Sequence, residues 1–262
     1  MIGNRSGIVL QERDRHLLHE LALLRVIDRE QAQILCGFRS VTRVNTRLLA
    51  LARAGLLNRF FAGTFIGGKK SLYALSRKGA SLIGATGPIL QRPRDSVLVG
   101  DRFVDHQLKI NAIYLIVRHR PTPMAGVRCA GWLVLKVPLT DASGVIPDGY
   151  FELATLHKAT SFFLEVDLGT ENLSIWKKKI EAYLSYATSG SFETQFRRPQ
   201  FRVLVIADSE RRLHSIRAVI AKHTDKIFWV SSFDLVKDNG FWAPIWFRPR
   251  NTEPRSLFGG DA

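Results

Sequence analysis

The sequence lacks several features that would assign it to common classes of protein. It contains only two cysteines, Cys36 and Cys129, with no second Cys and no His at ligand spacing. We therefore expect neither a disulfide framework nor a zinc finger. No apolar run is long enough to span a membrane, and the segment MIGNRSGIVLQERDR has no apolar centre typical of a signal peptide. These absences predict a cytoplasmic protein without a membrane partner.

Acidic residues are scarce relative to basic ones. The 262 residues include 38 Lys and Arg against 23 Asp and Glu, which gives a formal net charge of +15. This charge favours a polyanionic partner, either nucleic acid or an anionic membrane surface, and of the two we expect nucleic acid. With 46% hydrophobic residues, the chain is long enough to bury one large core or two smaller ones.

The basic charge is concentrated at the N-terminal end, where residues 1–90 hold 14 Lys or Arg against 5 Asp or Glu. Leucines at helical spacing, two favourable N-caps (Asp28 and Ser40) and two glycine stops (Gly37 and Gly55) predict three helices. Two apolar runs around a basic turn then predict a β-hairpin, and a short helix, RKGASLIG, follows it. The predicted helices and hairpin cover residues 14–25, 28–37, 40–55 and 56–76.

This order resembles a winged helix-turn-helix domain, over residues 10–85. A helix that enters the major groove of DNA needs polar and cationic side chains on its leading turns and an apolar face behind them. The third predicted helix has this pattern, and the hairpin tip would touch flanking phosphates. The alternative is that these charges form the solvated face of a domain that binds protein. The predicted DNA contacts are Arg39, Ser40, Thr42, Arg43, Asn45, Arg47, Lys69 and Lys70.

A second domain is expected after an aperiodic linker, ATGPILQRPRDSVLVG, that contains two prolines. We predict a long helix from Asp101 to Arg120, then three strands, a helix, a strand, a helix and a strand, so that residues 101–248 form an α/β domain with a mixed sheet. The overall class is thus α+β or α/β. The basic, aperiodic segment 249–262 is predicted to be a disordered tail.

Three acids lie at predicted strand ends: Asp148, Glu165 and Asp167. Together with the strand order, the P-D at 147–148 and the E-x-D at 165–167 resemble the restriction-endonuclease-like nucleases, whose motif is P-D followed by E-x-K. An Asp and a Glu from neighbouring strands supply the hard oxygen donors that Mg²⁺ prefers. Asp148 and Glu165 are the predicted metal ligands, and Mg²⁺ the cofactor.

The third position of the motif departs from that pattern, because Asp167 stands where the nucleases have Lys. Three alternatives stay open. Lys178 or Lys179 of the next helix reaches the site, or Asp167 is a third metal ligand, or catalysis has been lost. A further alternative is that the acids only accept hydrogen bonds from backbone N–H groups. The candidate catalytic residues are Asp148, Glu165, Asp167 and Lys179.

Several phrases together, DHQLKINAIYL, PDGYFEL, FFLEVDLGTE and KKKIEAYLSY, resemble the replication-relaxation family of plasmid and mobile-element proteins. The resemblance implies DNA binding at a mobile element, with His106 and Asn111 as further site positions. The predicted function is sequence-specific binding of double-stranded DNA in replication initiation or in relaxation and mobilisation. One alternative is a Mg²⁺-dependent nickase. Another is a protein-interaction adaptor or transcriptional regulator. The expected protein partners are a second copy of the chain, in a homodimer, and a relaxase or replication protein.

Overall fold

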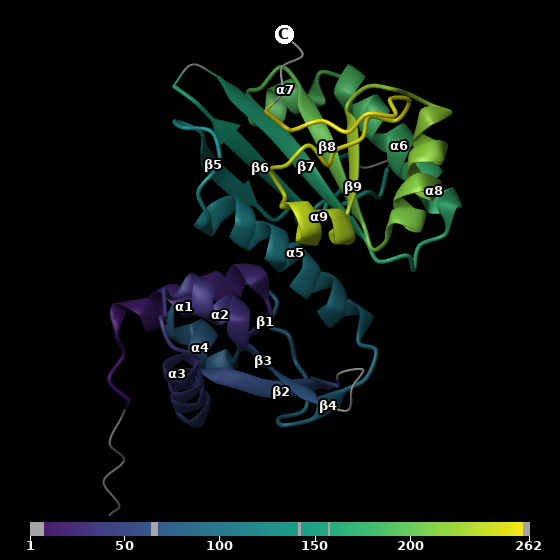
Figure 1. Cartoon of the computed structure of the whole chain (residues 1–262). Helices are drawn as coiled ribbons and strands as arrows, with labels where there is room; N and C mark the ends of the chain where they lie inside the picture. The colour runs from purple at the N-terminus through teal and green to yellow at the C-terminus, as the bar shows by residue number, and fades with distance from the viewer. Residues whose placement is uncertain (1–7, 64–67, 141–142, 157, 259–262) are drawn as a thin grey trace, which may run out of the picture. The chain divides into compact units, whose positions relative to one another are not determined.

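A computed structural model describes residues 8–63, 68–140, 143–156 and 158–258 of the chain. The protein divides into two compact units, Met1–Leu115 and Ile116–Ala262. Each unit contains a sheet with both parallel and antiparallel strand pairs, so the predicted α+β class is confirmed (Figure 1). Within the described ranges, no helix has both the length and the apolar character needed to cross a membrane.

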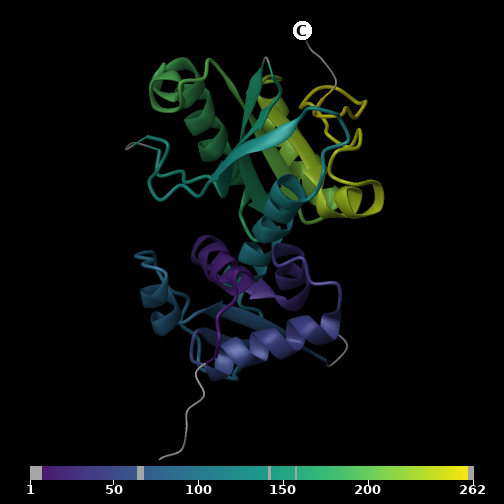
Figure 2. The same ribbon diagram turned by 90° about the vertical axis from the view of Figure 1, so that its left-hand side faces the viewer.

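The first unit has three N-terminal helices and a small sheet in the order β1-β3-β2-β4. Strands β2 and β3 form an antiparallel hairpin, and β4 pairs with β2 in parallel. Figure 2 shows α3 along its length, below α1. The elements are α1 (Glu12–Leu24), β1 (Ile27–Asp28), α2 (Arg29–Leu35), α3 (Val41–Arg53), β2 (Leu57–Gly63), β3 (Lys69–Leu75), α4 (Arg77–Leu82), β4 (Val97–Leu98) and α5 (Arg102–His119), of which α5 extends past the boundary between the units.

The predicted helices of this unit are confirmed by their caps and buried faces. Asp28 accepts a hydrogen bond from the Gln31 amide at 2.8 Å and so caps α2. Ser40 occupies the N-cap position of α3, although its side chain makes no capping bond. The apolar side chains that recur at helical spacing in α1 and α3 are buried: Leu17, Leu18, Leu21, Leu24, Val44, Leu48 and Leu51.

The linker and most of α5 pack with the first unit. Leu90 and Val104 are buried in a cluster with Phe60 of the hairpin. Asn111 donates from Nδ2 to the carbonyl oxygens of Leu24 at 3.2 Å and Val26 at 2.6 Å. The sequence predicts instead that this helix opens the second domain, after a linker between 84 and 101. Helical periodicity shows that a helix has an apolar face but not which core the face covers, and this explains the difference.

The second unit is built on a five-stranded sheet in the order β5-β6-β7-β8-β9. Strands β5, β6 and β7 are antiparallel, whereas β7, β8 and β9 are parallel and are joined through helices. Figure 1 shows α6 and α8 beside the sheet. The elements are β5 (Arg128–Leu133), β6 (Gly149–Ala154), β7 (Ala159–Asp167), α6 (Leu173–Thr188), α7 (Ser191–Phe196), β8 (Phe201–Ala207), α8 (Glu210–Ala221), β9 (Phe228–Ser232) and α9 (Phe233–Asn239).

An aromatic core fills the space between this sheet and α6 and α8. Phe163 of β7 lies at its centre, with ring centroids of Phe201 at 4.9 Å and Tyr183 at 5.7 Å. Trp176, Ile180 and Tyr183 on the buried face of α6 confirm the predicted amphipathic helix. This packing orients α6 so that the carboxyl end of β7 faces it.

The described residues 249–258 contact other parts of the second unit, where the sequence predicts a disordered tail from 249. Trp246 and Arg255 form an antiparallel bridge, and Leu257 is buried. Arg217 of α8 donates to the carbonyl oxygens of Arg248 at 3.0 Å and Pro249 at 3.1 Å. Side chains from elsewhere in the fold hold this segment, so its own sequence needs no helical or strand periodicity. Its composition therefore did not predict these contacts.

Candidate functional site

Asp148 stands at the start of β6, where the backbone is tightly constrained. Its amide donates to the Leu164 carbonyl at 3.0 Å, and its Oδ2 accepts from the Val166 amide at 2.7 Å. The next residue must be glycine, because a Cβ on Gly149 would lie 2.8 Å from the ring of Trp132. Trp132 stacks on Phe151 with its ring centroid 5.5 Å away. The P-D-G sequence thus fixes the half-buried Asp148 carboxylate against β7.

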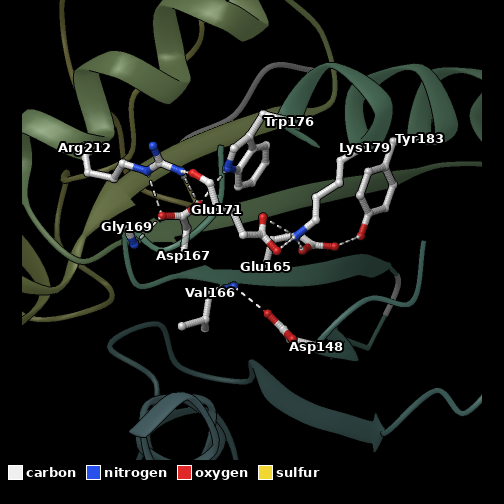
Figure 3. A network of polar contacts seen from close by, with 10 residues as sticks. All are labelled: Asp148, Glu165, Val166, Asp167, Gly169, Glu171, Trp176, Lys179, Tyr183 and Arg212. Atoms are coloured by element: carbon white, nitrogen blue, oxygen red, sulfur yellow. Dashed lines mark hydrogen bonds and ion pairs between the residues drawn. The ribbon is translucent and has the colours of Figure 1, made fainter. Parts of the chain in front are cut away.

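Glu165 lies near the end of β7 and is 1% exposed. Two side chains of α6 bind its carboxylate (Figure 3). The Tyr183 hydroxyl donates to Oε1 at 2.5 Å, and the Lys179 ammonium lies 2.9 Å from Oε2. Lys179 also contacts the carboxylate of Glu171, at 3.0 and 3.2 Å. Because residues four apart share one face of a helix, α6 presents Lys179 and Tyr183 side by side to Glu165.

Burial dominates the electrostatics of this group. Loss of solvation raises the pKa of Glu165 to about 7, while the charge of Lys179 opposes the rise and that of Asp148 adds to it. Burial by itself lowers the pKa of Lys179, but the carboxylates of Glu165 and Glu171 outweigh it and raise that pKa. Lys179 therefore stays protonated, and above about pH 7 its positive charge lies beside the ionised Glu165 carboxylate.

Asp167 has a different environment, although it is also 1% exposed. Arg212 of α8 donates through Nε to Oδ1 at 2.8 Å and through Nη2 to Oδ2 at 2.9 Å. Trp176 Nε1 and the Gly169 amide each donate at 2.7 Å. Burial alone would raise the pKa of Asp167, yet the bonds from Arg212 and Trp176 lower it. Asp167 therefore joins β7, α6 and α8 and has its oxygens occupied by protein donors.

The structure bears on the alternatives for the third motif position. Lys179 contacts Glu165, whereas Lys178 is exposed on α6. Asp167 accepts four hydrogen bonds from protein donors, two on each carboxylate oxygen. Across the described part of the chain, no three or more His, Cys, Asp or Glu side chains are grouped to hold a metal ion. Asp148 and Glu165 thus remain a pair of candidate ligands.

Sequence reasoning did not assign Tyr183, Glu171 and Arg212 to the site. The spacing of Tyr183 four residues after Lys179 is a signal that could have identified it. Arg212 has no such signal, because it is 45 residues from Asp167 along the chain. His106 and Asn111 both lie in the first unit, and Asn111 there binds backbone carbonyl oxygens.

The predicted DNA contacts on α3 and directly before it divide into two groups. Arg39, Thr42 and Arg43 are exposed, and Ser40, Asn45 and Arg47 are partly buried. A surface hollow lies along this face of the helix, with Thr42, Arg43 and Arg47 in its lining. The apolar residues on the opposite face of α3 are in the core. The helix therefore presents a polar and cationic surface to solvent.

Arg47 differs from the exposed arginines because it forms an internal ion pair. Its Nε donates to Asp14 Oδ1 at 2.8 Å and its Nη2 contacts Asp14 Oδ2. Nη2 also donates to the Val9 carbonyl at 2.7 Å. Asp14 is 1% exposed, and the bonds from Arg47 hold its pKa below the ordinary value against the effect of burial. Arg47 is thus placed to join α3 to α1.

The two predicted lysines of the hairpin also differ. Lys69 is exposed at the start of β3. Lys70 Nζ lies 2.6 Å from Asp28 Oδ2, so it pairs with the residue that caps α2. Residues 64–67 of the predicted hairpin turn lie outside the described residues.

Comparison with known proteins identifies the family. The model of the replication-relaxation family matches residues 18–197, which is more than half of the chain. No curated protein and no solved structure matches the chain. The matched range begins in α1, includes α3 and the hairpin, and extends through Asp148, Glu165 and α6. This chain therefore belongs to the replication-relaxation family.

Proposed function

We propose that the protein binds double-stranded DNA at a specific sequence and acts in replication initiation, relaxation or mobilisation of a plasmid or other mobile element. The observation that carries this proposal is the leading end of α3, where Thr42 and Arg43 on the helix and Arg39 before it are exposed. Family membership supports a role in replication or relaxation. The net charge of +15 favours a polyanionic partner.

In this proposal the first unit is a winged helix-turn-helix domain. Its α2 and α3 would form the helix-turn-helix, and the β2–β3 hairpin would be the wing. Arg39 and Arg43 would reach base edges in the major groove, because a guanidinium can donate two bonds to guanine. Lys69 would contact phosphate and add affinity without sequence information.

Substitution of the exposed arginines tests the DNA-binding role. Arg39→Ala and Arg43→Ala should each weaken binding of the full-length protein to its selected DNA site by about 1–3 kcal/mol, because each removes a side chain that reads a base edge. Arg53→Ala is the matched control, because Arg53 is exposed in the last turn of the same helix. Wild-type affinity of the Arg39/Arg43 double variant would show that α3 does not read DNA. Absence of DNA binding by the wild type would favour the protein-interaction adaptor.

A second candidate function is a metal-dependent DNA nickase, and one observation supports it. Lys179 reaches Glu165 from α6 and supplies the basic group that the motif lacks at Asp167. The order of three antiparallel strands followed by α6 and β8 in the second unit resembles the core of restriction-endonuclease-like nucleases. Asp148 would come from one strand of the pair and Glu165 from its neighbour, in the places of that family's acidic residues.

The donor set fits Mg²⁺ in kind, because Asp148 and Glu165 offer hard carboxylate oxygens. When bound, Mg²⁺ would polarise the scissile phosphate and activate water. Lys179 would hold its positive charge beside Glu165 and stabilise negative charge on the phosphate. Tyr183 fixes the rotamer of Glu165 through the 2.5 Å bond. Because Glu165 is 1% exposed, access to it requires movement of the α6 side chains that cover it.

A nicking assay on supercoiled plasmid with Mg²⁺ or Mn²⁺ tests this second function. Glu165→Gln and Lys179→Ala should abolish nicking and leave DNA binding intact, whereas Lys178→Ala, the exposed neighbour, should nick like the wild type. A wild type that binds DNA but never nicks would leave the second unit as a scaffold.

A further inference from the structure

A pocket at the opposite end of the same sheet is lined by positively charged side chains from four segments. Lys158 precedes β7, Arg202 lies in β8, Lys226 precedes β9, and Arg248 comes from the segment after α9. No Asp or Glu belongs to the described residues that line this pocket. Segments that are distant in sequence thus contribute charge of a single sign.

The strand register explains why these residues meet. Ser161 of β7 is paired with Phe201 of β8, and Val203 of β8 with Phe228 of β9. The bridge between Val230 and Phe247 adds the C-terminal segment beside β9. Parallel strands have their amino ends at one edge of the sheet, so the residues around these ends form one surface. From Ala159 to Asp167, β7 spans about 26 Å, since each step adds about 3.3 Å. This pocket is therefore distinct from the Glu165 site.

Two of these charges are held in place by an aromatic ring. The guanidinium carbons of Arg202 and Arg248 lie 4.9 and 5.2 Å from the ring centroid of Trp229. Arg248 also donates through Nη2 to the Asp225 carbonyl at 2.6 Å. Cation–π contacts of this kind orient arginines without removing their charge. Lys158 and Lys226, by contrast, are exposed at the rim.

We propose that this pocket binds backbone phosphates of duplex DNA, as a second contact in addition to α3. The inference rests on the proposed DNA-binding function for the identity of the ligand. Lys158 and Lys226 are exposed cations at this pocket, and a phosphodiester backbone carries the opposite charge that would attract them. Trp229 and Phe201 are buried, so their rings cannot stack on a DNA base. The proposed contact is therefore with phosphate only and is independent of DNA sequence.

The test is the affinity and salt dependence of the full-length protein for a fluorescently labelled duplex, measured by anisotropy. Lys158→Ala/Lys226→Ala should bind roughly 10- to 100-fold more weakly at about 0.1 M salt, and the salt slope should fall by about two. The control Lys136→Ala/Lys237→Ala removes the same charge from exposed positions outside the pocket, and should retain the wild-type slope. Both substituted lysines are exposed, so the melting temperature should not change.

The Arg39→Ala/Arg43→Ala variant separates this inference from the proposed function. If only the Arg39→Ala/Arg43→Ala variant binds DNA more weakly, the pocket does not contact DNA and α3 is the DNA site. If only the pocket variant binds DNA more weakly, the pocket contacts DNA and the proposed DNA-binding role of α3 is wrong. Equal effects of the pocket variant and its control would overturn the inference. The inference is also overturned if the pocket variant binds DNA normally but fails to bind vesicles of anionic phospholipid. In that case the pocket would bind lipid phosphates and not DNA.

Discussion

The leading end of α3 and the carboxyl end of β7 are both rich in charge, but they use it differently. At this end, Arg43 on α3 and Arg39, which precedes the helix, are exposed to solvent. At the end of β7, Glu165 and Asp167 are each 1% exposed and are bound by Lys179, Tyr183, Arg212 and Trp176. Clustered charge therefore predicts a partner, but the partner can lie inside the chain. Of these two regions, only the first exposes the charges compared here to solvent.

Each region also contains one charged residue whose burial or pairing is more typical of the other region. Arg47 lies on α3 but pairs with the buried Asp14, in the manner of the β7 acids. Asp148 lies at the sheet but is only half buried, unlike Glu165 and Asp167. Substitutions that remove an internal partner should mainly lower stability, whereas substitutions of exposed charges should mainly lower affinity. The following predictions test this division.

The largest effect is expected for Arg212→Ala. This change leaves the buried Asp167 carboxylate without its bidentate partner, and removal of one member of a buried pair costs about 3–5 kcal/mol. The free energy of unfolding in urea at neutral pH measures the loss. Arg211→Ala removes an exposed neighbour on the same helix and should change stability by less than about 0.5 kcal/mol. Similar stabilities of the two variants would show that Asp167 does not depend on this pair.

Glu165 and Asp167 should influence stability with opposite dependence on pH. The folded pKa of Glu165, about 7, is above the ordinary value of 4.5, so between these pH values the folded protein binds more protons than the unfolded chain. Wild-type stability relative to Glu165→Gln should therefore fall as pH rises through this window, by up to about 3 kcal/mol.

For Asp167 the sign is reversed. Its pKa is lowered from 3.8, so its stabilising contribution is present above that pH and disappears as pH falls through the folded pKa. Thermal unfolding of the wild type, Glu165→Gln and Asp167→Asn across the acidic range measures both effects. Parallel curves for the two variants would contradict the assignment of Lys179 and Arg212 as their respective partners.

A smaller loss of stability is expected for Arg47→Ala. The change removes bonds to the buried Asp14 carboxylate, and hydrogen bonds to charged groups contribute about 1.5–3 kcal/mol. Arg43→Ala should leave the free energy of unfolding within about 0.5 kcal/mol of the wild type, since Arg43 is exposed. Chemical denaturation of both variants measures the difference, and unaltered stability of Arg47→Ala would leave Arg47 available for the proposed contact with DNA.

The smallest difference in stability is expected within the hairpin. Lys70→Ala breaks a partly exposed pair with Asp28 and should cost at most about 1 kcal/mol, whereas Lys69→Ala should cost nothing measurable. Each substitution should reduce the salt slope of DNA binding by about one if each lysine contacts a phosphate. A change in slope for Lys69→Ala alone would show that Lys70 remains paired with Asp28 in the complex.

The local elements of this protein could be predicted from residue spacing and capping residues. The spacing of Leu17, Leu21 and Leu24 predicted α1, Asp28 predicted the start of α2, and the apolar face of α6 predicted its burial. The strand order around Asp148 and Glu165 was also predicted correctly. These features depend on periodicity and capping, which act over a few neighbouring residues and can be recognised in one amino-acid sequence.

Which charges are paired, and which core each helix covers, became known only from the packing of the folded chain. Arg212 meets Asp167 across 45 residues, Arg47 meets Asp14 across 33, and Asn111 of α5 binds carbonyl oxygens more than 80 residues earlier in the chain. The C-terminal segment is ordered by Arg217 of α8 in the same way. Such contacts depend on how separate elements pack, and the spacing of residues within one element carries no information about them.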